Sequence, residues 1–206
     1  VIFEMARGSF RAGLNTVFEK MQGLMKSDAE NRFREAMKFY RDACRTAEQH
    51  DQFSESLRLF SKSIEDYREN AFAYLHMGHI LHYHRKQRDF KRAMEYYSLC
   101  FTSAELFEEQ MQVAAQGYFY SGWVSSAVYG DIQSGIDLTI KAIEMEPQMS
   151  EAYYNLAKFY AAFGDEDEAS AQLREAIETF DRRYCLKVEK DSDFSAIRDE
   201  IRRLFY

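Results

Sequence analysis

The chain has 206 residues, of which 46% are hydrophobic and 16% aromatic, so it can bury a sizeable core and is not composed like a disordered protein. Its single proline and nine glycines are too few for the many turns of an all-β sandwich or barrel, which favours an all-α fold. The formal charge of −7 disfavours nucleic acid as a partner, and no apolar run approaches the roughly 18 residues that a membrane span requires.

The first predicted element is an amphipathic helix within residues 1–28. Its apolar residues recur seven positions apart: Phe3, Phe10, Val17 and Leu24. Ser27 and Glu30 then form a capping box, which predicts that the next helix begins there. Two interpretations stay open: the helix packs as a lid on the residues that follow, or it forms a coiled coil or docks on a partner. The second would allow self-association through residues 1–26.

Residues 29–186 carry a recurring pattern in which an aromatic residue is followed by small residues at helical spacing. A first segment has Tyr40, Ala43, Cys44, Ser56, Phe60 and Ser63. A second segment has Tyr74, Met77, Gly78, Ala93, Tyr97 and Cys100. Small residues opposite bulky ones predict pairs of helices that pack closely.

The clearest internal repeat lies in the second half of the chain and has a period of 34 residues. Four pairs keep this spacing: Gly130 and Gly164, Asp131 and Asp165, Gly135 and Ala169, and Ala142 and Ala176. A glycine can end a helix in a left-handed conformation, the aspartate after it can cap the next helix, and small residues let two helices approach. The period therefore predicts two consecutive helix hairpins with equivalent turns.

The last of these segments resembles the tetratricopeptide repeat, in the form found in bacterial proteins. The resemblance rests on Tyr153, Leu156, Ala157, Tyr160, Gly164, Ala169, Leu173 and Ala176. It implies an all-α solenoid of about four helix hairpins over residues 29–186. In residues 187–206 we expect a capping helix over 192–205 that covers the last repeat, because apolar residues recur there at helical spacing. These are Phe194, Ile197, Ile201 and Leu204.

The resemblance also implies that the first helices of successive hairpins line a concave groove that binds a protein or peptide partner. The residues at the contact positions are Lys38, Arg41, Arg45, His79, His82, Tyr120, Tyr154, Asn155 and Lys158. Basic and aromatic side chains suit a peptide or helix that carries acidic and apolar side chains. The alternative interpretation is that the aromatic residues pack between repeats and that the charged ones are merely solvated.

Four histidines, His76, His79, His82 and His84, lie close together in the sequence. Two histidines one helical turn apart can share a zinc ion, but these drift around the helix, and no Cys or carboxylate lies at a matching spacing. The sequence therefore favours neutral groove histidines that titrate near pH 6.5 and make binding sensitive to pH. No metal or cofactor is expected.

The remaining motifs favour a binding protein over an enzyme. Cys44, Cys100 and Cys185 form no CxxC pair and no signal-peptide pattern is visible, which favours a reducing, cytoplasmic setting. The sequence has no glycine-rich phosphate loop, HExxH or GxSxG motif. We therefore expect a non-enzymatic protein-interaction scaffold. The alternative hypothesis is a regulatory or oligomerisation region of a larger bacterial signalling or defence protein.

Overall fold

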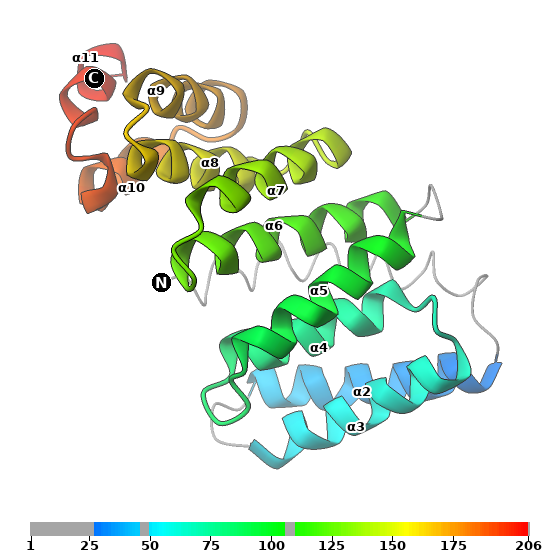
Figure 1. Ribbon diagram of the computed structural model, residues 1–206. Helices are drawn as coiled ribbons and strands as arrows, with labels where there is room; N and C mark the ends of the chain where they lie inside the picture. The colour runs from blue at the N-terminus through cyan, green and yellow to red at the C-terminus, as the bar shows by residue number, and fades with distance from the viewer. Residues whose placement is uncertain (1–26, 46–49, 106–109, 206) are drawn as a thin grey trace. The chain divides into compact units, whose positions relative to one another are not determined.

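The computed structural model describes residues 27–45, 50–105 and 110–205, and every regular element in them is helical (Figure 1). The chain divides into two compact units, Val1–Ala73 and Tyr74–Tyr206. The heptad pattern predicted to form a helix in residues 1–26 lies outside the described residues. The division into an N-terminal helix, a repeat array and a capping segment stays a prediction. Within the described residues, no helix combines the length and the apolar character that a bilayer crossing needs.

The first unit is built on a hairpin of two helices, α2 (Ser27–Arg45) and α3 (His50–Asp66), which pack on each other. As predicted, α2 begins at Ser27. One face of α2 supplies the core because its buried residues follow the helical period: Phe33, Ala36, Met37 and Tyr40. From α3, Phe60 is fully buried and its ring lies 5.7 Å from that of Phe33, centroid to centroid.

Two buried serines occupy the positions in α3 where the repeat pattern requires small residues. Ser56 and Ser63 are both fully buried. The hydroxyl of Ser56 donates to the backbone carbonyl of Ala36 at 2.8 Å, and the side-chain amide of Asn70 donates to the Ser63 hydroxyl at 3.0 Å. Because a buried hydroxyl is costly unless it is paired, these contacts explain how serine replaces alanine here. Asn70 also accepts from the backbone N–H of Ala73 at 3.1 Å, at the start of the next helix.

The second unit contains a series of consecutive helices. They are the end of α4 (Ala71–Tyr83), α5 (Phe90–Ala104), α6 (Met111–Ala127), α7 (Ile132–Met145), α8 (Ser150–Phe163) and α9 (Glu166–Glu175), which a π-helical turn (Ala176–Phe180) prolongs. From α5 onward each helix packs against the next one along the chain. The fold is therefore an all-α, repeat-like solenoid, as the sequence predicted.

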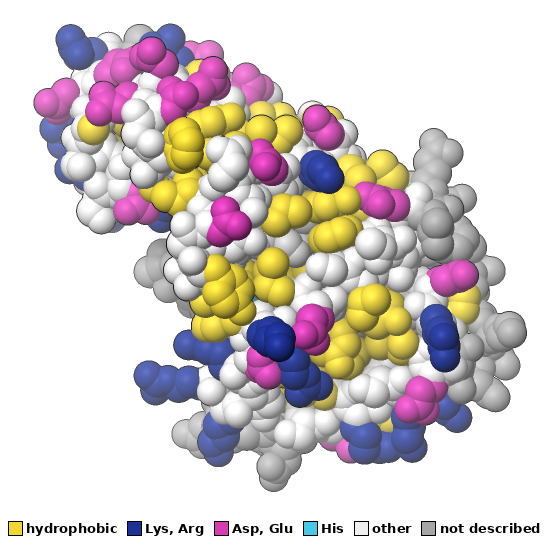
Figure 2. All heavy atoms as spheres, viewed as in Figure 1, with side chains coloured by type: hydrophobic (Ala, Val, Ile, Leu, Met, Phe, Trp, Pro, Cys, Tyr) yellow, Lys and Arg dark blue, Asp and Glu magenta, His cyan; other side chains and the backbone are white. Residues whose placement is uncertain are grey.

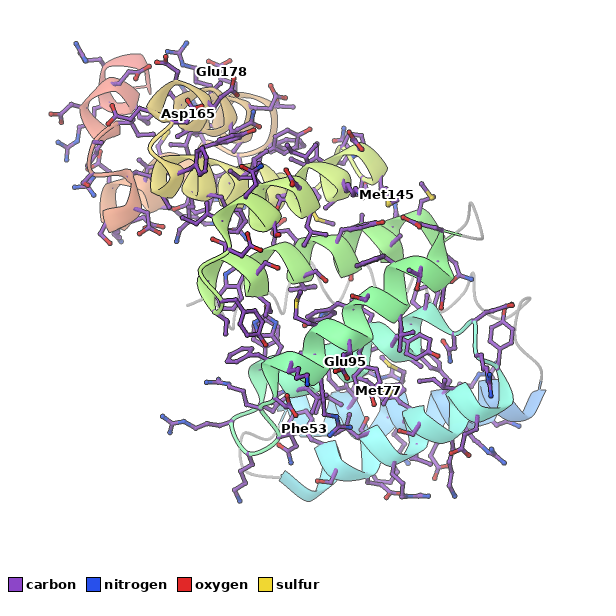
Figure 3. All side chains as sticks on the ribbon, viewed as in Figure 1. Phe53, Met77, Glu95, Met145, Asp165 and Glu178 are labelled. Carbon is purple, nitrogen blue, oxygen red and sulfur yellow. The ribbon has the colours of Figure 1, made fainter. Side chains whose placement is uncertain are left out.

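The turns of the last two hairpins are equivalent, which confirms the 34-residue period. Gly130 and Gly164 have φ angles of 72° and 92°, in the left-handed region that favours glycine. Directly after them, Asp131 accepts from the backbone N–H of Ser134 at 3.1 Å, and Asp165 accepts from that of Glu168 at 3.2 Å. Asp165 thus caps the start of α9 (Figure 3), where acidic side chains gather around the helix N-terminus (Figure 2).

Small residues bring the paired helices together at the predicted positions. Ala142, Ala169 and Ala176 are fully buried. Gly135 of α7 faces α6 so closely that a Cβ atom added to it would lie 2.7 Å from the Cβ of Ser126. The absence of a side chain at Gly135 therefore allows the close approach of these two helices.

The C-terminal segment differs from the prediction of one helix over residues 192–205. It forms α10 (Tyr184–Lys190), a 3-10 turn (Ser192–Phe194) and α11 (Arg198–Phe205). The chain bends at Asp191, whose side chain accepts from the backbone N–H of Asp193 at 3.2 Å. The backbone carbonyl of Asp191 also accepts from the Arg198 guanidinium at 2.8 Å, which holds the start of α11 against the bend.

Three of the four apolar residues predicted to cover the last repeat do so. Phe194, Ile197 and Ile201 are buried in one cluster with Leu173 and Ile177, which follow the α8–α9 turn. Leu204 lies outside the residues whose side chains are described. The capping prediction thus identified the right residues, although it missed the break in the helix.

Candidate functional site

One exposed face of α2 is basic. Arg34, Lys38 and Arg41 are spaced four and three residues apart, which places them on the same side of the helix, and all three are exposed. The Nε of Arg41 donates to the backbone carbonyl of Met37 at 3.1 Å, which lays its side chain back along the helix. We call these three residues the α2 basic stripe. The chain has a net charge of −7, so this stripe is a local basic surface on an acidic protein, and it suits the binding of carboxylates.

A second group of predicted site residues forms an aromatic cluster between α4, α5 and α6. His79 and His82 of α4 are only 2% and 3% exposed. The ring of His79 lies 4.4 Å from that of Tyr120, and the ring of His82 lies 4.8 Å from that of Trp123, centroid to centroid. The Nδ1 of His82 shares a hydrogen bond of 3.0 Å with the hydroxyl of Tyr97. His79, His82 and Tyr120 are therefore brought together, with both histidines buried in the interior and Tyr120 partly exposed.

Burial sets the protonation of these histidines. It lowers the pKa of His82 to about 4, with a smaller contribution from the positive charge of Arg88. Burial also lowers the pKa of His79 well below its ordinary value, and the neighbouring His76 and His82 act in the same direction. The expectation that these residues titrate near pH 6.5 is wrong, because an imidazolium in this aromatic interior would lose its hydration.

The third group lies on α8 and meets carboxylates from the C-terminal segment. The Nζ of Lys158 lies 2.8 Å from Oδ2 of Asp193 and 3.1 Å from Oδ2 of Asp191. The hydroxyl of Tyr154 donates to Oδ2 of Asp191 at 3.0 Å, and the ring of Tyr154 stacks on that of Tyr184 with centroids 5.2 Å apart. Two of the predicted contact residues of α8 are thus already engaged with acidic groups.

The charges in this group stabilise one another. Burial works against the charge of Lys158, but its bonds to Asp193 and Asp191 prevail and raise its pKa. Burial also works against the charge of Asp191 and alone would raise its pKa. The backbone N–H of Asp193 and the ammonium of Lys158 outweigh burial, so the pKa of Asp191 is lowered. At neutral pH the group is therefore a lysine held between two carboxylates.

No group of three or more His, Cys, Asp or Glu side chains that could hold a metal ion occurs among the described residues. The rings of His76 and His79 lie 5.9 Å apart, centroid to centroid, and are tilted 74° to each other. Both side chains are buried. His76 and His79, which the sequence suggested as possible zinc ligands, thus pack against each other as aromatic rings.

Comparison with known proteins agrees with the turn geometry. The family model described as tetratricopeptide repeat matches residues 129–184, the stretch that holds both glycine turns and both capping aspartates. Residues 129–184 therefore match the tetratricopeptide repeat. No curated protein matches it in sequence.

Solved structures share this fold at low sequence identity. A crystal structure of MamA is 17% identical, covers 75% of this chain and 85% of its own, and has a TM-score of 0.54. MamA from residue 41 to its end, from Desulfovibrio magneticus RS-1, is 15% identical, covers 86% and 90%, and has a TM-score of 0.52. TTC0263, a thermophilic TPR protein in Thermus thermophilus, is 13% identical, covers 86% and 96%, and has a TM-score of 0.50. At such identities the likeness shows the fold alone.

On the tetratricopeptide hairpins, the nine predicted contact residues fall into different environments. Lys38 and Arg41 are exposed on α2, and the side chain of Arg45 lies outside the description. His79 and His82 are buried inside the second unit, whereas Tyr120 on α6 is partly exposed, as are Tyr154, Asn155 and Lys158 on α8. Their role as a binding site stays a prediction.

Sequence reasoning missed three residues of these surfaces. Arg34 extends the α2 basic stripe, and its spacing from Lys38 was a signal that could have found it. Asp191 and Asp193 were assigned to the capping segment and carried no local signal for a contact with α8. Their partner, Lys158, is more than thirty residues away in sequence, so only the folded repeat places them together.

Proposed function

We propose that this chain is a non-enzymatic scaffold that binds a segment of a partner protein on the first helices of its hairpins. The tetratricopeptide fold suits a protein-interaction role because stacked hairpins expose one helix surface after another along the array. The observation that carries the proposal is the α2 basic stripe. It supports a partner segment rich in carboxylates.

The contacts on α8 support the same partner chemistry. Here a first helix holds Asp191 and Asp193 through the ammonium of Lys158 and the hydroxyl of Tyr154. The phenol ring of Tyr154 also offers apolar area beside these charges. An acidic and apolar peptide or helix is therefore the partner that we propose, with Lys38, Arg41 and the partly exposed residues of α8 as its contacts.

The buried histidines take a supporting role in this proposal. His79 and Tyr120 fix the packing of α4 on α6, and a partner would reach the buried His79 and His82 only after that packing opened. For the cellular setting we propose the reducing cytoplasm that the cysteines predict, where Cys100 and Cys185, both buried free thiols, would stay reduced.

A binding measurement tests the α2 basic stripe. The probe is a fluorescein-labelled amphipathic helical peptide with Leu on one face and Glu on the other, titrated by fluorescence anisotropy. The double variant Lys38→Ala/Arg41→Ala should bind it about tenfold more weakly, because two charge-assisted contacts are lost. The same peptide with Gln in place of Glu should bind neither protein well.

The matched control is Lys62→Ala/Arg68→Ala, which removes the same two charges from exposed positions of the same unit outside α2. Its affinity should stay within about twofold of the unmodified chain, since exposed charges that do not contact the peptide are largely screened by solvent and salt. An equal loss in both double variants would attribute binding to net charge and refute the assignment of the site to α2.

A further inference from the structure

The face of α8 that we propose as a partner-binding surface is occupied by the chain itself. We propose that residues 191–194 act as a built-in acidic ligand that competes with a partner for Tyr154 and Lys158. This inference rests on the proposed function, because it assigns a regulation to the same first-helix surface.

The contacts have the chemistry expected of a bound acidic segment. Both carboxylates of the segment reach the one ammonium of Lys158, at 2.8 Å for Asp193 and 3.1 Å for Asp191, and Tyr154 donates a third contact at 3.0 Å. The ring of Phe194 packs edge-on against Tyr154 with centroids 5.3 Å apart. An acidic pair followed by an aromatic residue thus covers two predicted contact residues of α8.

The repeat period explains how the segment comes to lie there. Tyr184, the first residue of α10, follows Ser150, the first residue of α8, by one 34-residue period, and their hydroxyls lie 2.9 Å apart. Helix α10 therefore occupies the position that the first helix of a next hairpin would have. It has only 7 residues, whereas α8 has 14. Because α10 ends early, at Lys190, the residues that follow it place Asp191 and Asp193 against α8.

The Asp193 carboxylate can leave α8 while the rest of the cap stays folded. Phe194 is fully buried and anchors the segment in the core, whereas the side chain of Asp193 is 46% exposed and that of Lys158 is 31% exposed. Exposed ion pairs exchange readily with competing charges. A partner carboxylate can therefore replace Asp193 on Lys158 without disturbing Phe194.

A first experiment measures whether the segment shields Lys158. The variants are Asp193→Ala and Asp191→Asn/Asp193→Ala, in which the asparagine side chain would keep the cap of the 3-10 turn. Labelling with a small amine-reactive reagent, read for Lys158 by mass spectrometry, should speed up several-fold in the double variant. The control Asp137→Asn/Asp199→Ala removes the same charges from exposed positions on α7 and α11 and should leave the rate unchanged. An unchanged rate in Asp191→Asn/Asp193→Ala would overturn the proposal.

A second experiment measures competition, with the same labelled Leu/Glu peptide. Asp191→Asn/Asp193→Ala should bind it about tenfold more tightly than the unmodified chain, Asp137→Asn/Asp199→Ala should not, and adding Lys158→Ala to the first variant should cancel the gain. Faster labelling of Lys158 without a gain in affinity would overturn the competition while leaving binding at α2 intact. If no variant binds the peptide at all, the proposed function fails, and the proposed regulation fails with it.

Discussion

His82 shows how one buried side chain links the fold to pH. Its ring lies beside Tyr97 and Trp123, and burial lowers its pKa from 6.5 to about 4. Between these values the unfolded chain binds a proton that the folded chain does not, so the free energy of unfolding falls as the pH falls from 6.5 towards 4. The full effect of a shift of this size is about 3 kcal/mol, and none of it applies above pH 7.

Urea unfolding at neutral pH and near pH 4.5 checks this expectation. The variant His82→Gln should lose less stability between the two pH values than the unmodified chain, because it has no proton to take up on unfolding. His84→Gln, in the turn after α4, is the matched control and should keep most of the pH dependence. Identical losses in the unmodified chain and in His82→Gln would contradict the burial of a neutral imidazole.

The histidines also mark the limit of prediction at the residue scale. The aromatic, aliphatic and histidine side chains of α4 point to every side of the helix, so the sequence does not indicate which face is buried. Only the packing of α5 and α6 against it buries His79 and His82. A position derived from the family pattern could not reveal this, because it specifies a place on the helix and not the neighbours that cover it.

At the scale of the element, Gly135 sets the distance between α6 and α7. A Cβ atom there would lie 2.7 Å from the Cβ of Ser126, closer than real contacts allow. Gly135→Ala should therefore lower the free energy of unfolding by about 1 to 3 kcal/mol, as overpacking does. Adding Ser126→Gly removes the clashing atom and should restore part of the loss. Denaturant titration of both variants checks this, and an undiminished stability of Gly135→Ala would contradict the close approach.

Elements were predictable where their signals are local. The glycine turns, the capping aspartates and the small residues of the last two hairpins all follow from the 34-residue period and have the predicted geometry. The break before α11 was not predictable, because the apolar spacing of Phe194, Ile197 and Ile201 continues through it. The bend at Asp191 depends on backbone contacts, including one to Arg198, which hydrophobic periodicity does not report.

The whole molecule combines a repeat fold with an uneven distribution of charge. The chain is acidic overall, so a carboxylate-rich partner is attracted only where basic side chains gather. The α2 basic stripe is such a place, and the lysine of α8 is held by Asp191 and Asp193. Binding at α8 should therefore increase when the C-terminal carboxylates are displaced.

Zero-length cross-linking reports which lysine a partner carboxylate contacts. A carbodiimide joins a Glu carboxylate of the Leu/Glu probe to a lysine amine that it contacts, and peptide mapping identifies the lysine. With the unmodified chain we predict that the main cross-link is at Lys38, and that Lys158 joins it only in Asp191→Asn/Asp193→Ala. Cross-links confined to lysines outside the first helices, such as Lys62, would contradict the claim.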